Sequence, residues 1–218
     1  MNTILRYRVT VLSVMYAVMG LIVSSVFVLS MLSGIPSQRF TKDPAILSGV
    51  NPVVGVVSSL GILLWCFGAS VALFVWSTRR GSREDIPVTQ YLFYSGLGTA
   101  WLMADDLFMF HDCVLPIYLG VHELVTYAVY LAASLLFLVL FLPVIVRTGY
   151  RVFVAAIVFF ALSLGLDMLT FILPFAIPHE NFLEDSFKFF GIGTWCYYLA
   201  ETAYRFHATD ASDGGLHL

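Results

Sequence analysis

The sequence has few charged residues. Only 11% of its 218 residues are Asp, Glu, Lys or Arg, whereas 60% are hydrophobic. In soluble domains about a quarter of all residues are charged, so this deficit excludes an ordinary soluble enzyme. The formal net charge of −3 also offers no basic surface for nucleic acid. The composition therefore predicts a protein whose solvent is lipid.

Cysteine and metal-binding motifs are also scarce. The three cysteines are Cys66, Cys113 and Cys196, and two of them fall in the middle of long hydrophobic runs. No disulfide framework is expected from this placement. The chain contains no HxxxH, HExxH or ExxH spacing. Neither a haem nor a nucleotide is indicated.

Long hydrophobic runs are present instead. A helix needs about 20 apolar residues to cross a bilayer, and six stretches meet this length. They are residues 9–33, 52–77, 90–112, 119–146, 152–176 and 182–204. Only helices or closed barrels satisfy the backbone in lipid, and runs of this length are helical. The sequence predicts an all-α integral membrane protein, with one six-helix transmembrane domain over 1–207 and a flexible tail over 208–218.

The basic residues indicate the orientation. Eight of them lie in the N-terminal segment, the second and fourth loops and the end of the last span: Arg6, Arg8, Arg79, Arg80, Arg83, Arg147, Arg151 and Arg205. The first loop holds only Arg39 and Lys42. Because Lys and Arg concentrate in cytoplasmic loops, both termini are predicted to be cytoplasmic. We expect the plasma membrane of a bacterium.

The acidic residues gather at the opposite side. Seven lie in the outer halves of the third to sixth spans: Asp105, Asp106, Asp112, Glu123, Asp167, Glu184 and Asp185. The only strong base among them is Lys188. At 1.5 Å per residue, Asp106, Asp167 and Lys188 all lie about 24–25 Å from the cytoplasmic ends of their helices. Charges inside a bilayer usually face the bundle interior, so an acidic pocket that faces outward is predicted.

Helical phase separates the neighbouring acids of the third span. Asp105 and Asp106 diverge by about 100° on a helix. Both can face protein only if the third span is central to the bundle. Asp105 and Asp112 are seven residues apart and share a face.

The leading hypothesis is a metal site. One lysine cannot neutralise seven acids, so the deeper carboxylates must be protonated, hydrated or bound to a cation. Carboxylates and imidazoles are ligands for zinc, iron or calcium. The candidate ligands are Asp106, His111, His122, Glu123, Asp167 and Asp185.

A metal at this depth suggests a reaction. Bound metal lowers the pKa of a water molecule for hydrolysis, and lipid-like substrates can enter from the outer leaflet. The sequence therefore predicts a metal-binding membrane protein that could act as a hydrolase, with Asp106, Asp167 and Lys188 as catalytic residues.

Two other functions stay open. Buried carboxylates beside a lysine also occur in proton or ion-coupled transporters, and Glu201, Tyr197, Tyr198 and Tyr204 would continue such a path inward.

The third function is structural. Asp106, Asp167 and Lys188 would clamp three helices together, with Tyr130 as a further hydrogen-bond partner. The chain would then be an accessory subunit of a membrane complex, with lipids and other subunits as its partners.

Overall fold

The computed structural model describes residues 3–41, 44–51, 53–79, 86–172 and 180–213, and these ranges are helical with short connections and no strand. Two compact units are present, Met1–Val54 and Gly55–Leu218. Several predicted features lie outside the described residues: Lys42, the loop 80–85 with Arg80 and Arg83, the end of the fifth span at 173–176, and 214–218 of the predicted tail. Residues 208–213, also assigned to that tail, are helical.

The first unit contains one long helix. α1 spans Thr3–Ser33 and is followed by the short helices α2, Gln38–Thr41, and α3, Pro44–Ser48. Serine hydroxyls do not interrupt α1, because Ser25 and Ser33 donate to the carbonyls four residues earlier, at 2.8 and 2.7 Å. Gly34 follows α1 with a φ of 68°, a conformation that favours glycine.

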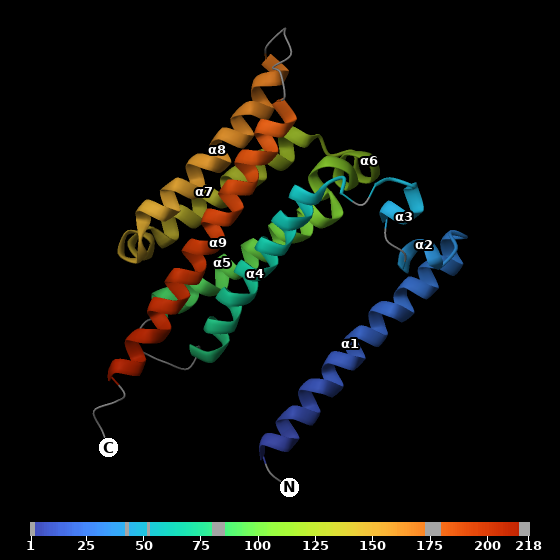
Figure 1. The fold of residues 1–218 in the computed structure, drawn as a ribbon. Helices are drawn as coiled ribbons and strands as arrows, with labels where there is room; N and C mark the ends of the chain where they lie inside the picture. The colour runs from blue at the N-terminus through green and yellow to red at the C-terminus, as the bar shows by residue number, and fades with distance from the viewer. Residues whose placement is uncertain (1–2, 42–43, 52, 80–85, 173–179, 214–218) are drawn as a thin grey trace. The chain divides into compact units, whose positions relative to one another are not determined.

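The second unit is a helical bundle (Figure 1). Its long described helices are α4, Val56–Arg79; α5, Ile86–Phe108; α7, Glu123–Thr148; α8, Tyr150–Ile172; and α9, Glu180–Asp213. Each helix contacts the next in the order α4, α5, α7, α8 and α9, and α9 also contacts α4. A further contact joins α5 directly to α9. Since α5 contacts α4, α7 and α9, it has the central position that its two adjacent acids require.

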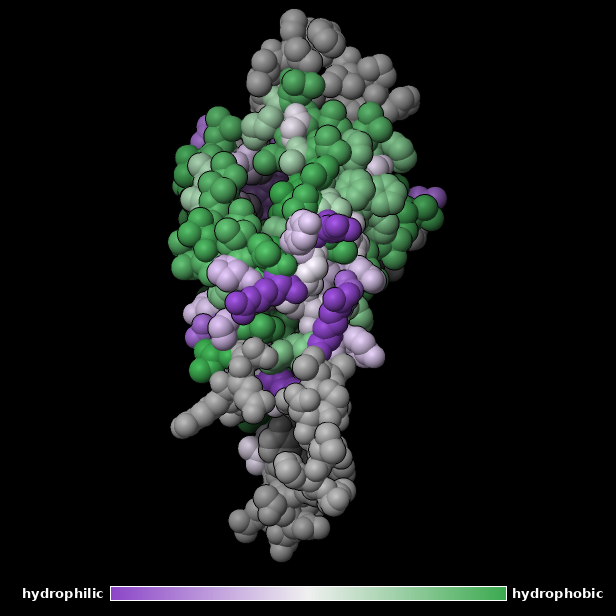
Figure 2. Space-filling view, turned by 90° about the vertical axis from the view of Figure 1, so that its left-hand side faces the viewer, coloured by the Kyte–Doolittle hydropathy of each residue, from purple (hydrophilic) through white to green (hydrophobic). Residues whose placement is uncertain are grey.

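Four helices among the described residues are long and apolar enough to cross a membrane. These segments are Tyr16–Ser33, Val56–Arg79, Leu124–Thr148 and Tyr150–Leu169. The predicted helical membrane class is thereby supported for α1, α4, α7 and α8, whereas α5 and α9 are not among the four. Figure 2 shows a face of the molecule on which hydrophobic side chains predominate. The six crossings and the cytoplasmic termini stay predictions.

The apolar core lies toward one end of the second unit. Tyr91, Leu92, Tyr198 and Leu199 have no exposed surface. The full core set is Ala72, Val75, Tyr91, Leu92, Phe141, Val144, Ile145, Phe153, Tyr198, Leu199 and Ala203. It joins the last turns of α4 and α7 to the first turns of α5 and α8. The opposite end of the bundle, where α5 ends and α9 begins, holds Asp105, Asp106, Glu184, Asp185 and Lys188.

The connection from α5 to α7 has unusual backbone geometry. α5 ends at Phe108, and Met109 follows with a φ of 52°, the only non-glycine residue with a positive φ in the described part of the chain. The π-helical turn η1, Phe110–Val114, and the short helix α6, Leu115–Leu119, come next. A left-handed methionine is sterically unfavourable, so nearby contacts must stabilise this turn.

Candidate functional site

An ion pair joins three helices at the charged end of the bundle. The Lys188 ammonium on α9 donates to Asp106 Oδ1 on α5 at 2.7 Å. The indole nitrogen of Trp65 on α4 donates to Asp106 Oδ2 at 2.9 Å. Asp106 therefore accepts on both carboxylate oxygens, from two different helices. The exposed fraction of its side chain is only 12%, which strengthens these charge-assisted bonds.

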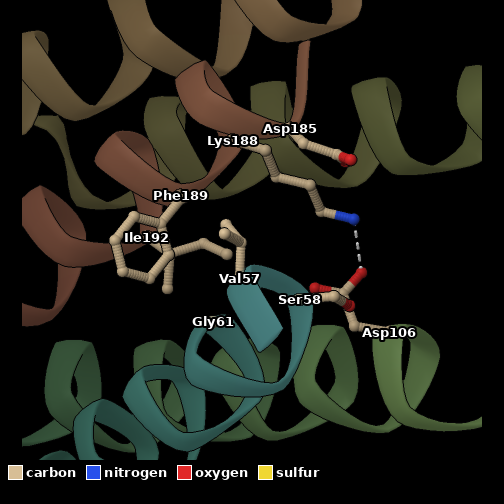
Figure 3. A pocket seen from close by; sticks show the side chains of 8 residues that line it. All are labelled: Val57, Ser58, Gly61, Asp106, Asp185, Lys188, Phe189 and Ile192. Carbon is tan, nitrogen blue, oxygen red and sulfur yellow. Dashed lines mark hydrogen bonds and ion pairs between the residues drawn. The ribbon is translucent and has the colours of Figure 1, made fainter. Parts of the chain in front are cut away.

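A small cavity lies beside this ion pair (Figure 3). Its volume is about 30 Å³, and one water molecule needs roughly 10–15 Å³ of such space. One side of the lining is polar and the other apolar, and the residues are Val57, Ser58, Gly61, Asp106, Asp185, Lys188, Phe189 and Ile192. Figure 3 shows the Lys188 ammonium and the Asp106 and Asp185 carboxylates on the same side of this space.

His111 forms a second charged cluster. Its Nδ1 lies 2.6 Å from Asp105 Oδ2, and its Nε2 lies 3.0 Å from Asp112 Oδ1. The His111 backbone N–H also donates to Asp105 Oδ1 at 3.0 Å. Both ring nitrogens can donate only in the imidazolium form, so two carboxylate contacts favour a positive charge on His111. Asp105 is 2% exposed, and His111 supplies its counter-charge.

The two adjacent acids of α5 therefore face different partners. Asp105 bonds His111, and Asp106 bonds Lys188 and Trp65. This divergence confirms what helical phase predicts for residues i and i+1. The depth comparison that placed Asp106 level with Lys188 agrees with the 2.7 Å contact between them.

Asp167 contacts a residue of α7 that the sequence did not single out. The Tyr127 hydroxyl on α7 donates to Asp167 Oδ2 on α8 at 3.2 Å. Tyr130, expected to support the clamp, accepts a hydrogen bond from the Trp101 indole at 3.2 Å. The observed clamp therefore consists of Asp106, Lys188 and Trp65. No sequence pattern singles out Trp65, because tryptophan is also a common packing and interface residue.

A second set of polar side chains follows the contact between α5 and α9 deeper into the bundle. The Trp195 indole donates to Thr99 Oγ1 at 3.0 Å. Further along, the Tyr91 hydroxyl donates to the Tyr198 hydroxyl at 3.1 Å, which lies 2.9 Å from Thr148 Oγ1. Sequence analysis named only Tyr198 of this set. The spacing of Tyr91, Ser95 and Thr99, four residues apart on one helix face, was the available signal.

The other residues of the predicted inward path lie elsewhere. Tyr197 and Tyr204 are 59% and 73% exposed. Glu201 forms an ion pair with Arg205 one turn away on α9. Only Tyr198 of the predicted path therefore belongs to the polar interior.

The predicted metal ligands have separate partners. His111 lies between two carboxylates, and Asp167 accepts from Tyr127. His122 Nδ1 accepts from the backbone N–H of Leu124 at 3.3 Å and caps α7. Asp106 and Asp185 share the cavity, whereas the side chain of Glu123 is outside the described part.

The described residues contain no group of three or more His, Cys, Asp or Glu side chains that could hold a metal ion. A zinc, iron or calcium site, and the catalytic roles of Asp106, Asp167 and Lys188, stay predictions.

Residues 11–202 match a family described as a domain of unknown function, DUF8692. The chain belongs to this family. The matched range contains Trp65, Asp106 and Lys188, so the clamp lies within the family's domain. No curated protein and no solved structure shows significant similarity to the chain.

Proposed function

We propose that this chain is a six-span integral membrane protein with a structural role, in which Asp106 clamps α4, α5 and α9 together. The observation that carries the proposal is the use of both Asp106 oxygens by donors from two other helices. A clamp of this kind fixes the packing of a membrane scaffold. Such a scaffold suits an accessory subunit of a larger membrane complex.

The helix arrangement supports membrane insertion of the two less apolar helices. A charged side chain at the centre of a transmembrane helix costs about 2.5–3.5 kcal/mol on insertion scales. α5 and α9 contact each other and the apolar helices α4, α7 and α8. Their charges therefore meet partners within the bundle, which lowers this cost.

The basic residues support the proposed orientation. Arg79 near the end of α4 donates to the carbonyl of His207 on α9 at 2.9 Å. Arg147 lies in the last turn of α7, and Arg151 in the first turn of α8. These residues occur at the end of the bundle opposite the clamp. With that end in the cytoplasm, the clamp lies in the outer half of the membrane.

Replacement of Lys188 tests the clamp. Lys188→Met removes the charge but keeps an apolar stem, and it leaves the Asp106 carboxylate without its counter-charge. Breaking a buried pair in this way costs about 3–5 kcal/mol. Because Lys188 is partly exposed, the loss in free energy of unfolding should be somewhat smaller than this range. SDS titration of detergent-purified protein measures the loss.

Two controls make the result specific. Lys188→Arg keeps the charge and should lose less stability than Lys188→Met. The double variant Asp106→Asn/Lys188→Met contains no orphaned charge and should recover part of the loss. A Lys188→Met protein as stable as the wild type would refute the clamp.

A proton relay is the second candidate, and the chain of hydroxyl groups formed by buried Tyr91 and Tyr198 and half-buried Thr148 favours it. A clamp does not need these groups, whereas a relay uses interior titratable and hydroxyl side chains. Proton flux into liposomes would be measured for wild type, Asp106→Asn and Tyr198→Phe. Flux that falls in both variants supports the relay, and absent or unchanged flux removes it.

A further inference from the structure

The connection between α5 and α7 is apolar, although it lies at the charged end of the bundle. Residues from Cys113 to Val121 include no Asp, Glu, Lys, Arg or His. The last three side chains of α6, Ile117, Tyr118 and Leu119, are 70%, 78% and 66% exposed. A continuous exposed apolar patch marks a surface that contacts a membrane or another molecule. The exposed end of α6 therefore indicates a contact outside the bundle.

Exposed apolar side chains also flank this connection in the chain. Phe108 and Met109, where the chain leaves α5, are more than half exposed, and so are Leu124 and Val125 at the start of α7. The segment Leu124–Thr148 is long and apolar enough to cross a membrane, and its exposed side faces lipid in the proposed function. Lipid can therefore cover α6 and the start of α7 together, without any further component.

Length and exposure restrict where this segment can lie. Phe110–Leu119 is apolar and helical but shorter than the candidate spans, and a crossing needs about 20 residues. An apolar segment of this size is usually either buried in a protein core or placed at the membrane interface. The exposure of Ile117, Tyr118 and Leu119 excludes burial in this bundle.

The backbone of the connection is suited to lipid, which offers no partner to a free N–H group. The N–H groups of Cys113 and Val114 donate to the Met109 carbonyl at 2.9 and 3.1 Å. The N–H group of Val121 donates to the Leu115 carbonyl at 3.1 Å. These bonds pair the turns before and after α6 within the segment, so its backbone can enter the edge of the hydrocarbon.

Aromatic side chains with a polar group surround the start of this connection. The Trp101 indole donates to the Tyr130 hydroxyl at 3.2 Å, and its ring stacks on Phe110 with 5.8 Å between the ring centroids. Trp and Tyr concentrate where hydrocarbon meets the headgroups, because their rings are apolar and their N–H or O–H groups are polar. Trp101 and Tyr118 are both exposed, which is the pattern of an interfacial aromatic belt.

We propose that residues 110–121 form an interfacial anchor, whose partner is the lipid bilayer. The anchor lies along the outer surface of the membrane and inserts Ile117, Tyr118 and Leu119 among the lipid chains just below the headgroups. The inference rests on the proposed function, because it needs the bundle to span the membrane with the end of α5 at the outer surface. It places the connection between two spans in lipid, whereas an ordinary outer loop lies in water.

A fluorescent probe at Ile117 tests the anchor. Ile117→Cys would be made in a chain in which Cys66, Cys113 and Cys196 are replaced by alanine, then labelled with an NBD group and reconstituted in phosphatidylcholine nanodiscs. Lipids that carry a nitroxide near the headgroup should quench the emission more strongly than lipids with a nitroxide deep in the acyl chain. Aqueous iodide should quench the emission little, because the probe lies below the headgroups.

Two control positions calibrate the quenching. Val139 is 72% exposed in the middle of α7, so a probe at Val139→Cys should be quenched most by the deep nitroxide. Asn51 is polar and exposed in the connection before α4, so iodide should quench a probe at Asn51→Cys more strongly than one at Ile117→Cys.

A second experiment uses the wild-type protein and does not depend on the folding of a variant. The nanodiscs would contain a phospholipid with a photoactivatable diazirine near the headgroup, and crosslinked peptides would be identified by mass spectrometry. Adducts are expected on residues 117–119 and on the first turns of α7. Adducts on α7 without any on residues 117–119 would overturn the anchor.

The outcomes separate this inference from the proposed function. A probe at Ile117 that iodide quenches as strongly as the probe at Asn51 lies in water, and one shielded from iodide and both nitroxides is covered by protein. Either result overturns the anchor. If the probe at Val139 also escapes both nitroxides, the membrane-spanning bundle itself is wrong. If lipid quenches the probe at Val139 but not the probe at Ile117, the bundle stands and only the anchor fails.

Discussion

Replacement of His111 should reveal how strongly burial controls the cost of losing a charge partner. The His111 imidazolium contacts one carboxylate that is almost fully buried and one that is half exposed. The exposed fractions of the Asp105 and Asp112 side chains are 3% and 52%. His111→Gln keeps a polar side chain of similar reach but removes the positive charge from both contacts.

The expected magnitude follows from this difference. Orphaning a buried ion-pair partner costs about 3–5 kcal/mol, and Asp105 meets that condition. A solvent-exposed pair contributes about 0–1 kcal/mol, which applies to Asp112. We therefore expect His111→Gln to lower the free energy of unfolding by about 3–5 kcal/mol, and Asp112→Asn to lower it by less than about 1 kcal/mol.

SDS titration of detergent-purified protein at neutral pH would measure these changes. The double variant Asp105→Asn/His111→Gln removes the orphaned charge, so it should be more stable than His111→Gln alone. The reasoning fails if Asp112→Asn is as destabilising as His111→Gln. It also fails if the double variant loses the sum of the two single losses.

Three further predictions concern packing, the polar interior and metal content. A Cβ on Gly191 would lie 2.8 Å from the Phe160 ring, whereas one on Gly193 would meet only Leu64 at 4.0 Å. Gly191→Ala should therefore cost about 1–3 kcal/mol, with Gly193→Ala as a near-neutral control in the same SDS titration. Tyr198→Phe should lose about 1–3 kcal/mol by orphaning two buried hydroxyl contacts, while exposed Tyr197→Phe should change the unfolding midpoint little. Elemental analysis of purified protein tests the metal-site hypothesis: about one equivalent of zinc, iron or calcium per chain would support it, and an amount well below one equivalent would remove it.

The position of the polar groups along each helix could be predicted well. Helix rise and rotation per residue are local constants, so residue counting placed Asp106 and Lys188 at one depth and pointed Asp105 and Asp106 in different directions. The choice of partner could not be obtained this way. Trp65 is 41 residues before Asp106 in the chain, and only the packing of α4 on α5 brings the two side chains together.

The environment of His111 was missed for a local reason. The hydropathy of residues 90–112 predicts one continuous helix. In the structure α5 ends at Phe108, and the left-handed Met109 begins a π-helical turn. This turn places the His111 ring between Asp105 and Asp112. Hydropathy does not reveal a positive φ at a methionine, because the contacts that stabilise it come from the folded chain.

The amino-acid sequence by itself predicted a helical backbone, with runs apolar enough to cross a membrane. Scarce charge and long apolar runs favour helices, since lipid offers no partner for backbone hydrogen bonds. The tertiary structure alone decided which acids are paired with which bases. A carboxylate in the interior takes the donor that packing brings within about 3 Å, and this distance depends on how the helices dock. The docking of α5 against α4 and α9 therefore divided one predicted acidic pocket into a clamp at Asp106 and a separate cluster at His111.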